Sequence, residues 1–295
     1  MNSADVKEIA GNAKRIISTL AGGFPSRSGL NPSVLEGAAR FIEQEFEKLG
    51  YPVTKQEYTA DGVPVRNLIA QTKGSGPRRI VLGAHYDTVL GTPGADDNAS
   101  GVAGLLELAR LLRDWNGNLT IDFVAFAHEE PPYFYTRLMG SRQYARKLRT
   151  EAVNVVGMLS LEMIGYAGQQ MSQVYPFPLL RQLGRYPRFG DYIALVGNLR
   201  SLGLLRLAKR AMKESCKIGV ETLSAPGFIP PLFLSDHSSF WKYRYPALMV
   251  TDTAFLRNPH YHAHTDTEET INYDFLAEVV IGILGVVMAL ELQAR

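Results

Sequence analysis

The sequence is poor in cysteine and in net charge. Its 295 residues include one cysteine, Cys216, so no intramolecular disulfide can form, and neither thiol redox chemistry nor a cysteine zinc cluster is expected. The 31 lysines and arginines nearly balance the 29 aspartates and glutamates, for a net charge of +2, and no run of five basic residues occurs. These absences predict that neither nucleic acid nor an acidic membrane is a partner.

Long apolar runs are also lacking. The amino-terminal stretch MNSADVKEIAGNAKRIISTLAGG carries charges throughout and has no apolar core of the signal-peptide kind. The most apolar stretch, residues 275–290, contains Glu278 and is shorter than the roughly 20 residues that a membrane span needs. We therefore expect a buried or half-buried final helix and a cytoplasmic location, with export only if a leader was removed.

Two motifs of hydrolytic enzymes are missing, one for a nucleophilic serine and one for a metal site. No G-x-S-x-G elbow occurs, and Pro132 stands four residues after His128, where an HExxH motif needs its second histidine. The stretch Ser235-Asp236-His237 therefore does not predict a serine hydrolase. We expect Asp236 to orient His237 or to line a substrate pocket.

Apolar runs and amphipathic segments alternate along the chain. The pattern predicts strands at 53–58, 65–71, 80–84, 119–127, 153–161 and 246–251, and helices at 4–21, 34–49, 101–115, 140–149, 201–215 and from 272. Residues 165–190 are rich in glycine, glutamine, proline and aromatics, which predicts a long loop. With no composition break, we expect one α/β domain over 1–295, a three-layer sandwich with a mixed, largely parallel central sheet flanked by helices.

Three of these strands end in residues that bind metals. The strand from 80 leads to His85 and Asp87, the next to Glu129 and Glu130, and the strand at 153–161 to Glu162. Sites in α/β sheets form at the carboxyl ends of strands, so we expect these residues at one edge. Asp87 can hold one ring nitrogen of His85 while the other binds a metal. Two adjacent buried carboxylates need a neutralising partner; a solvated turn is the alternative.

Two further segments add candidates. Asp97 lies on a turn before a predicted helix, where its carboxylate is either an N-cap or a ligand. Near the carboxyl terminus His260, His262 and His264 alternate beside Asp266. Either a surface cluster or a metal site explains this second pattern.

The combined motifs resemble the M28 family of zinc aminopeptidases over nearly the whole chain. In order along the sequence they are NLIA at 67–70, HYD at 85–87, GADDNASG at 94–101, EE at 129–130, EMIGY at 162–166 and PHYH at 259–262. The EEPP and EMIGY versions are most similar to a bacterial subgroup. The resemblance implies a zinc-exopeptidase-like fold and a metalloprotease that removes residues from peptides with a free N-terminus.

The resemblance also implies a site with two zinc ions. Asp97 would bridge them. His85 and Glu162 would complete one ion's ligands, and Glu130 and His262 those of the other. The best-studied members carry aspartate at the position of Glu162, and the extra methylene moves the carboxylate by roughly 1.5 Å, so one or two bound ions both remain open. A site so rich in carboxylates could also take Mn²⁺ or Co²⁺.

The catalytic roles follow from the same resemblance. Glu129 would be the general base for the water that the zinc ions activate, Asp87 would support His85, and Tyr261 would hydrogen-bond the oxyanion. Tyr133 and Phe134, with the loop at 166–190, would shape a specificity pocket, unless they only pack. His128 and His264, the latter at a position where many relatives have proline, are two further candidate ligands.

Two alternatives use the same fold. A glutaminyl-peptide cyclotransferase has one zinc ion and shares the positions of Asp97, Glu130 and His262, but the presence of His85 favours the two-metal peptidase. A binding module without catalysis would be expected to have lost ligands. All five ligand positions here hold residues that can bind a metal.

Overall fold

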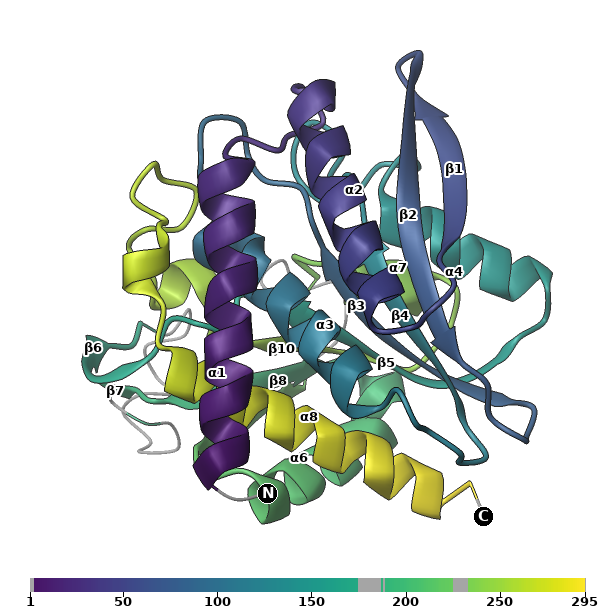
Figure 1. Ribbon diagram of the computed structural model, residues 1–295. Helices are drawn as coiled ribbons and strands as arrows, with labels where there is room; N and C mark the ends of the chain where they lie inside the picture. Colours follow the sequence, from purple (N-terminus) through teal and green to yellow (C-terminus); the bar gives the residue numbers. More distant parts are fainter. Residues whose placement is uncertain (1–2, 175–186, 188, 225–232, 295) are drawn as a thin grey trace.

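The computed structural model in Figure 1 describes residues 3–174, 187, 189–224 and 233–294. In these residues the main sheet is mixed and has eight strands, and a separate two-stranded sheet lies outside it. The strand order is β1-β2-β4-β3-β5-β10-β8-β9. The strands are β1 (Thr54–Ala60), β2 (Val63–Thr72), β3 (Arg78–His85), β4 (Thr120–Phe126), β5 (Asn154–Glu162), β8 (Tyr192–Gly197), β9 (Gly219–Ser224) and β10 (Ala247–Thr251). The central strands β4, β3, β5 and β10 run parallel to one another, and β1, β2 and β8 join antiparallel to their inner neighbours.

Helices cover both faces of the sheet, which confirms the three-layer α/β prediction (Figure 1). One face carries α1 (Ser3–Ser18), α2 (Pro32–Lys48), α3 (Gly101–Leu111), α6 (Leu202–Ser215) and α8 (Tyr273–Leu292). The opposite face carries α4 (Gly140–Thr150) and α7 (His237–Lys242). Both faces of the central strands are therefore buried, which is why these strands read as continuous apolar runs.

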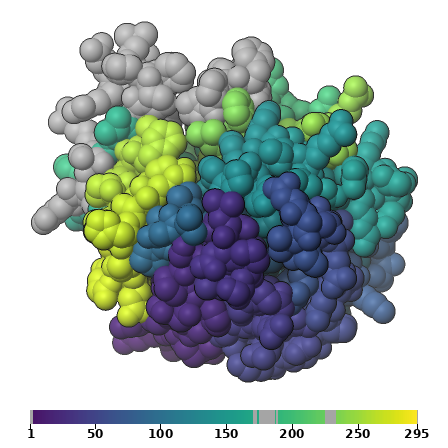
Figure 2. Space-filling view, turned by 90° about the horizontal axis from the view of Figure 1, so that it is seen from above, coloured from purple at the N-terminus to yellow at the C-terminus, as the bar shows by residue number. Residues whose placement is uncertain are grey.

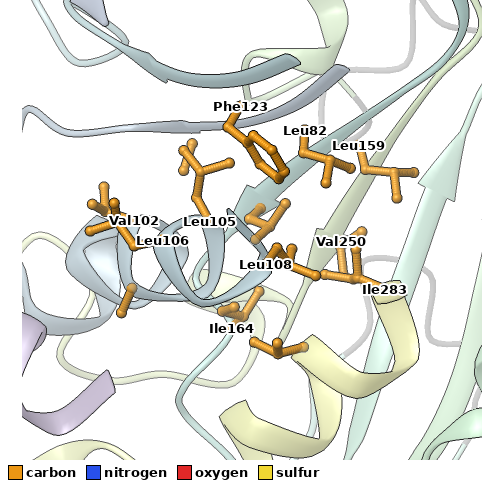
Figure 3. Packing of buried hydrophobic residues seen from close by; sticks show 14 of the residues in the cluster. Leu82, Val102, Leu105, Leu106, Leu108, Phe123, Leu159, Ile164, Val250 and Ile283 are labelled. Atoms are coloured by element: carbon orange, nitrogen blue, oxygen red, sulfur yellow. The ribbon is translucent and has the colours of Figure 1, made fainter. Parts of the chain in front are cut away.

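The main core lies between α3 and the central strands (Figure 3). Its side chains include Leu105 and Leu108 of α3 against Leu82, Phe123, Leu159 and Val250 of four neighbouring strands. Because α3 begins directly after the turn that carries Asp97, this packing sets where that turn lies relative to the sheet edge.

The final helix α8 is a core helix. By length and composition it could cross a membrane, with a hydropathy of 2.3, but 67% of its most apolar window is buried inside the protein. Near its end the buried Glu291 accepts hydrogen bonds from the backbone N–H groups of Asn118 and Leu119, at 2.9 Å each. The prediction of a buried or half-buried final helix is confirmed.

Some elements differ from the sequence-based expectations. The segment expected as a long loop contains the ribbon β6 (Gly168–Ser172) and β7 (Phe189–Gly190), and its residues 175–186 and 188 lie outside the described residues. β8, β9 and α7 were not predicted. β9 is a short, half-exposed edge strand and α7 has only six residues, so neither has a strong periodic pattern. The apolar run of β8, in contrast, is a pattern typical of a buried strand and could have predicted it.

The start of α3 is packed tightly against the end of β5. A Cβ on Gly101 would lie 2.4 Å from Asn98 Oδ1 and 2.5 Å from the carbonyl oxygen of Leu161. The Asn98 amide donates to that carbonyl at 2.8 Å and accepts from the N–H of Met163 at 3.0 Å. Only glycine leaves room for this bridge between the Asp97 turn and the strand that carries Glu162.

We predict that Gly101→Ala lowers the free energy of unfolding by about 2–3 kcal/mol, because the methyl group displaces Asn98 and breaks its hydrogen bonds. The matched control is Gly203→Ala in α6, where a Cβ meets nothing within 4 Å. That change should be neutral or stabilise by about 0.5 kcal/mol. Urea unfolding measures both, and equal stability of the two variants would contradict the tight bridge.

Candidate metal centre

The predicted ligands come from five segments that meet at one edge of the sheet. His85 ends β3, Glu162 ends β5 and Glu130 follows β4, and because these strands are parallel neighbours their carboxyl ends lie together. Asp97 comes from the turn before α3, and His262 from the loop after β10. Figure 2 looks onto this face, where the chain near residue 90 (blue), near 130 (teal) and near 260 (yellow) lies side by side.

Asp97 lies between the two histidines. Its Oδ1 is 3.4 Å from His85 Nε2, and its Oδ2 is 3.3 Å from His262 Nε2. His85 Nε2 is also 3.3 Å from Glu162 Oε2, and His262 Nε2 is 3.4 Å from Glu130 Oε2. Two groups of possible ligands therefore share Asp97, and within each group the ligand atoms lie within 4.8 Å of one another.

These separations fit ligands around a metal ion better than ion pairs. Four ligands at about 2.0–2.1 Å from a tetrahedral zinc ion lie roughly 3.3 Å apart, whereas a charged hydrogen bond is usually about 2.7–2.9 Å long. Asp97 Oδ1 is buried and has no hydrogen-bond partner among the described residues. An imidazole with carboxylates is a common donor set for zinc, so both groups fit such an ion.

Burial and mutual repulsion shift the titration of the cluster. Burial raises the pKa of Glu129 well above its usual range against the opposing charge of His85, and burial and Asp97 raise the pKa of Glu130 to about 8. Burial would lower the pKa of His262, but Asp97 and Glu130 raise it to about 10. Without a metal, carboxylates and His262 in the cluster therefore bind protons at neutral pH. These protons would have to leave when metal cations bind.

Asp87 holds the backbone of the two adjacent glutamates. Its two carboxylate oxygens accept hydrogen bonds from the N–H groups of Glu129 and Glu130, at 3.0 Å each. The Nδ1 of His85 lies 3.1 Å from the Asp87 carbonyl oxygen and 3.6 Å from the carboxylate. The predicted pairing of His85 with Asp87 thus runs mainly through the backbone carbonyl, which orients the ring so that Nε2 faces the cluster.

Asp266 holds the Asp97 turn in the same way. Its oxygens accept hydrogen bonds from the N–H groups of Asp96 and Asp97, at 2.9 and 3.0 Å. Ser235 in turn donates a hydrogen bond of 2.6 Å to Glu162 Oε2. Sequence reasoning noted both residues but missed these roles, because partners from distant segments leave no local pattern.

Arg27 is a further residue that the sequence did not reveal. It is fully buried and donates hydrogen bonds to the carbonyl oxygens of Tyr86, Pro93 and Gly94, at 2.6–2.7 Å. These carbonyls lie at both ends of the loop between His85 and the Asp97 turn. Burial lowers the pKa of Arg27 to about 10, so it stays charged near the carboxylates at neutral pH.

A cavity of about 90 Å³ opens beside the ligands. Besides ligand residues and Glu129, it is lined by Pro131, Phe134, Leu234 and Tyr261. Tyr261 stacks on the His262 ring, with centroids 3.7 Å apart, and burial and Asp97 raise its pKa, so its hydroxyl keeps its proton. The cavity thus offers a carboxylate, a phenol and an apolar wall side by side.

Not every predicted site residue reaches this cavity. Tyr133 is buried and stacks on His128 at 4.0 Å, away from the lining residues. Asp236 is fully buried and is not among the lining residues, and burial raises its pKa to about 7. His128 and His264 belong to neither ligand group found in the described part of the chain.

The sequence matches a known family and curated relatives. The profile of peptidase family M28 matches residues 67–287. An uncharacterized Escherichia coli K12 protein, YfbL, is 42% identical over 267 residues, which cover 88% of this chain and 81% of that protein. A probable leucine aminopeptidase of Trichophyton verrucosum is 29% identical over 271 residues, which cover 86% of this chain but 65% of the fungal protein.

Solved structures share the fold. A zinc aminopeptidase from Bacillus subtilis, BSAP, superposes with a TM-score of 0.73 at 16% identity, covering 94% of each chain. A Bacteroides thetaiotaomicron glutaminyl cyclase superposes with a TM-score of 0.70 at 21% identity, covering 94% of this chain and 96% of the cyclase. The family match spans about three quarters of the sequence and includes every predicted metal ligand, so the chain belongs to peptidase family M28.

Proposed function

We propose that this chain is an aminopeptidase that binds two zinc ions and hydrolyses the first peptide bond of substrates with a free N-terminus. The observation that carries the proposal is Asp97, whose two oxygens face two separate ligand groups. His85 and Glu162 would hold one ion, Glu130 and His262 the other, and Asp97 both. The probable leucine aminopeptidase among the relatives, although the chain spans only 65% of its length, supports the same reaction.

Zinc, when bound, supplies a Lewis acid that lowers the pKa of water and stabilises negative charge. The chain supplies the proton transfers. Glu129 lines the cavity beside the ligands, and its raised pKa suits a base that takes a proton from water and later delivers it to the leaving amine. Tyr261, which keeps its proton, would donate a hydrogen bond to the oxyanion.

The cavity also favours one end of a peptide. The carboxylates around Glu129 attract the positively charged α-amine, which supports removal of residues from the N-terminus. The apolar lining of Pro131, Phe134 and Leu234 suits an aliphatic first side chain.

A glutaminyl cyclase is the competing function, because a cyclase shares the fold. The second ligand group, built from His85 and Glu162, favours the peptidase.

The first test is a panel of aminoacyl-anilides with free amines, each beside its N-acetylated counterpart, with zinc present. We expect cleavage of the free-amine compounds alone, fastest for aliphatic residues, because the carboxylates need the amine and the wall is apolar. Cyclisation of N-terminal glutamine without anilide cleavage, or cleavage of acetylated compounds, would contradict the aminopeptidase.

Replacing Glu129 with glutamine should lower kcat by about 10²–10⁴-fold, because the amide cannot accept the proton. Zinc content, measured by elemental analysis, should stay unchanged, since Glu129 is in neither ligand group. Glu57→Gln, at an exposed position on β1, is the control and should keep full activity. Retained activity in Glu129→Gln would remove Glu129 from the role of base.

Zinc binding should depend on pH and reach two ions per chain. Because His262, with a pKa of about 10, and Glu130, with a pKa of about 8, are protonated near neutrality without metal, zinc must displace their protons. Affinity should therefore rise between about pH 6 and about pH 8, by about ten-fold per pH unit for each proton released. Calorimetric titration measures both. One ion per chain, or affinity that is independent of pH, would contradict this arrangement.

A further inference from the structure

The cavity beside the ligands is too small to enclose a peptide. Its volume is about 90 Å³, whereas sites that enclose a drug-sized molecule usually measure about 300–1,000 Å³. The cavity therefore has room for the first residue of a substrate, and the residues that follow must lie against the surface around its opening. The side chains packed directly against the cavity lining are the ones that the second residue would meet.

Two aromatic rings continue the apolar lining of the cavity. Phe134 and Leu234 line the cavity, and the residues next to them in the sequence are Tyr135 and Phe233. The ring centroid of Tyr135 lies 5.9 Å from that of Phe134 and 5.1 Å from that of Phe233. Both separations fall within the range of about 4.5–7 Å that is typical of aromatic rings in contact. The lining ring and the two further rings thus form one continuous apolar surface.

This surface is open to a ligand. Tyr135 has 50% of its surface exposed, and Phe233 is half-buried. A half-exposed aromatic ring that touches the lining of a cavity offers apolar area that a bound peptide side chain can cover. The exposed ring is therefore placed where a substrate that enters the cavity leaves it.

The Tyr135 ring is also held in a fixed orientation. The buried Arg142 donates a hydrogen bond of 2.8 Å from Nη1 to the carbonyl oxygen of Tyr135, and its guanidinium carbon lies 4.8 Å from the Tyr135 ring centroid. The φ angle of Tyr135 is +59°, in the left-handed region that bulky residues rarely adopt. Such a conformation persists only where the surroundings impose it. A ring fixed in this way loses little freedom when a ligand covers it.

We propose that Tyr135 and Phe233, here called the outer aromatic pair, bind the side chain of the second residue of the substrate. The inference rests on the proposed function and adds a substrate class to it: peptides with an aromatic residue directly after the cleaved bond. The first side chain would occupy the cavity against Phe134 and Leu234. The second would then lie on the rings that continue this wall, and an aromatic side chain gains most from packing on other rings.

The experiment compares Leu-Phe-Gly-amide with Leu-Gly-Gly-amide as substrates of the zinc-loaded enzyme. We expect KM for Leu-Phe-Gly-amide to be about five- to ten-fold lower, since a contact between aromatic side chains typically contributes about that factor. The kcat values should be similar, because the contact is made equally before and during the reaction. Equal KM values for the two peptides would overturn the outer aromatic pair.

The test variants are Tyr135→Asn and Tyr135→Phe. Asparagine tolerates the left-handed backbone but has no ring, so Tyr135→Asn should reduce the KM preference for Leu-Phe-Gly-amide to about two-fold or less. Phenylalanine keeps the ring, so Tyr135→Phe should keep the preference. The same preference in both variants, whether kept or lost, would overturn the inference, because the ring would then not be what binds the substrate.

Phe255→Ala is the matched control. Phe255 is as exposed as Tyr135, at 49%, but its ring contacts a different lining residue, Tyr261, with centroids 5.7 Å apart. This variant should keep the preference for Leu-Phe-Gly-amide. Loss of the preference in Phe255→Ala would place the second residue beside Tyr261 and overturn the assignment to Tyr135.

A third peptide, Phe-Gly-Gly-amide, tests the position of the contact. Its aromatic side chain is on the first residue, so its KM relative to Leu-Gly-Gly-amide should be the same in Tyr135→Asn as in the unmodified enzyme. A rise in Tyr135→Asn would show that Tyr135 contacts the first side chain and would overturn the outer aromatic pair as a site for the second.

A binding measurement separates this inference from the proposed function. Calorimetric titration of zinc-loaded Glu129→Gln with Leu-Phe-Gly-amide and Leu-Gly-Gly-amide measures the preference without turnover. Tighter binding of Leu-Phe-Gly-amide supports the outer aromatic pair even if the unmodified enzyme cleaves neither peptide, an outcome that would overturn the aminopeptidase alone. Equal binding overturns the outer aromatic pair and leaves the aminopeptidase intact.

Discussion

The repulsion among buried carboxylates at one edge of the sheet is the constraint on which the rest of this site depends. Asp97, Glu129, Glu130 and Glu162 are all at least nine-tenths buried, and four such charges are costly in a low-dielectric interior. Without metal, protons bound to Glu129 and Glu130, whose pKa values are raised, relieve this repulsion. Two divalent ions would cancel the four negative charges. Only a rigid scaffold keeps such groups together.

That rigidity comes from hydrogen bonds to the backbone of the segments that carry the ligands. Asp87 holds the two N–H groups of the adjacent glutamates, and Asp266 holds those of the Asp97 turn. Asn98 ties the turn to the end of β5, and the buried Arg27 closes the loop between β3 and the turn. The ligand positions therefore depend on residues that belong to neither ligand group and do not line the cavity.

Much of the fold was predictable because its signals are local. The apolar runs of β3, β4 and β5 and the amphipathic pattern of α3 indicated the central layers, and residues at the strand ends indicated a shared edge. The half-exposed edge strand β9 and the six-residue α7 have weak periodic patterns and were missed. Tyr133 and Phe134 are neighbours with similar side chains, yet only Phe134 lines the cavity.

The sequence by itself determined which residue types are available for chemistry and their order: a histidine and carboxylates at the ends of buried strands, and a histidine cluster before the last helix. Only the tertiary structure decided that Asp97 faces both histidines, and that His128 and His264 stay apart from the ligand groups. The physical reason is that hydropathy and chain order are properties of short segments, whereas contacts of a few ångströms between distant segments are set by packing of the whole core.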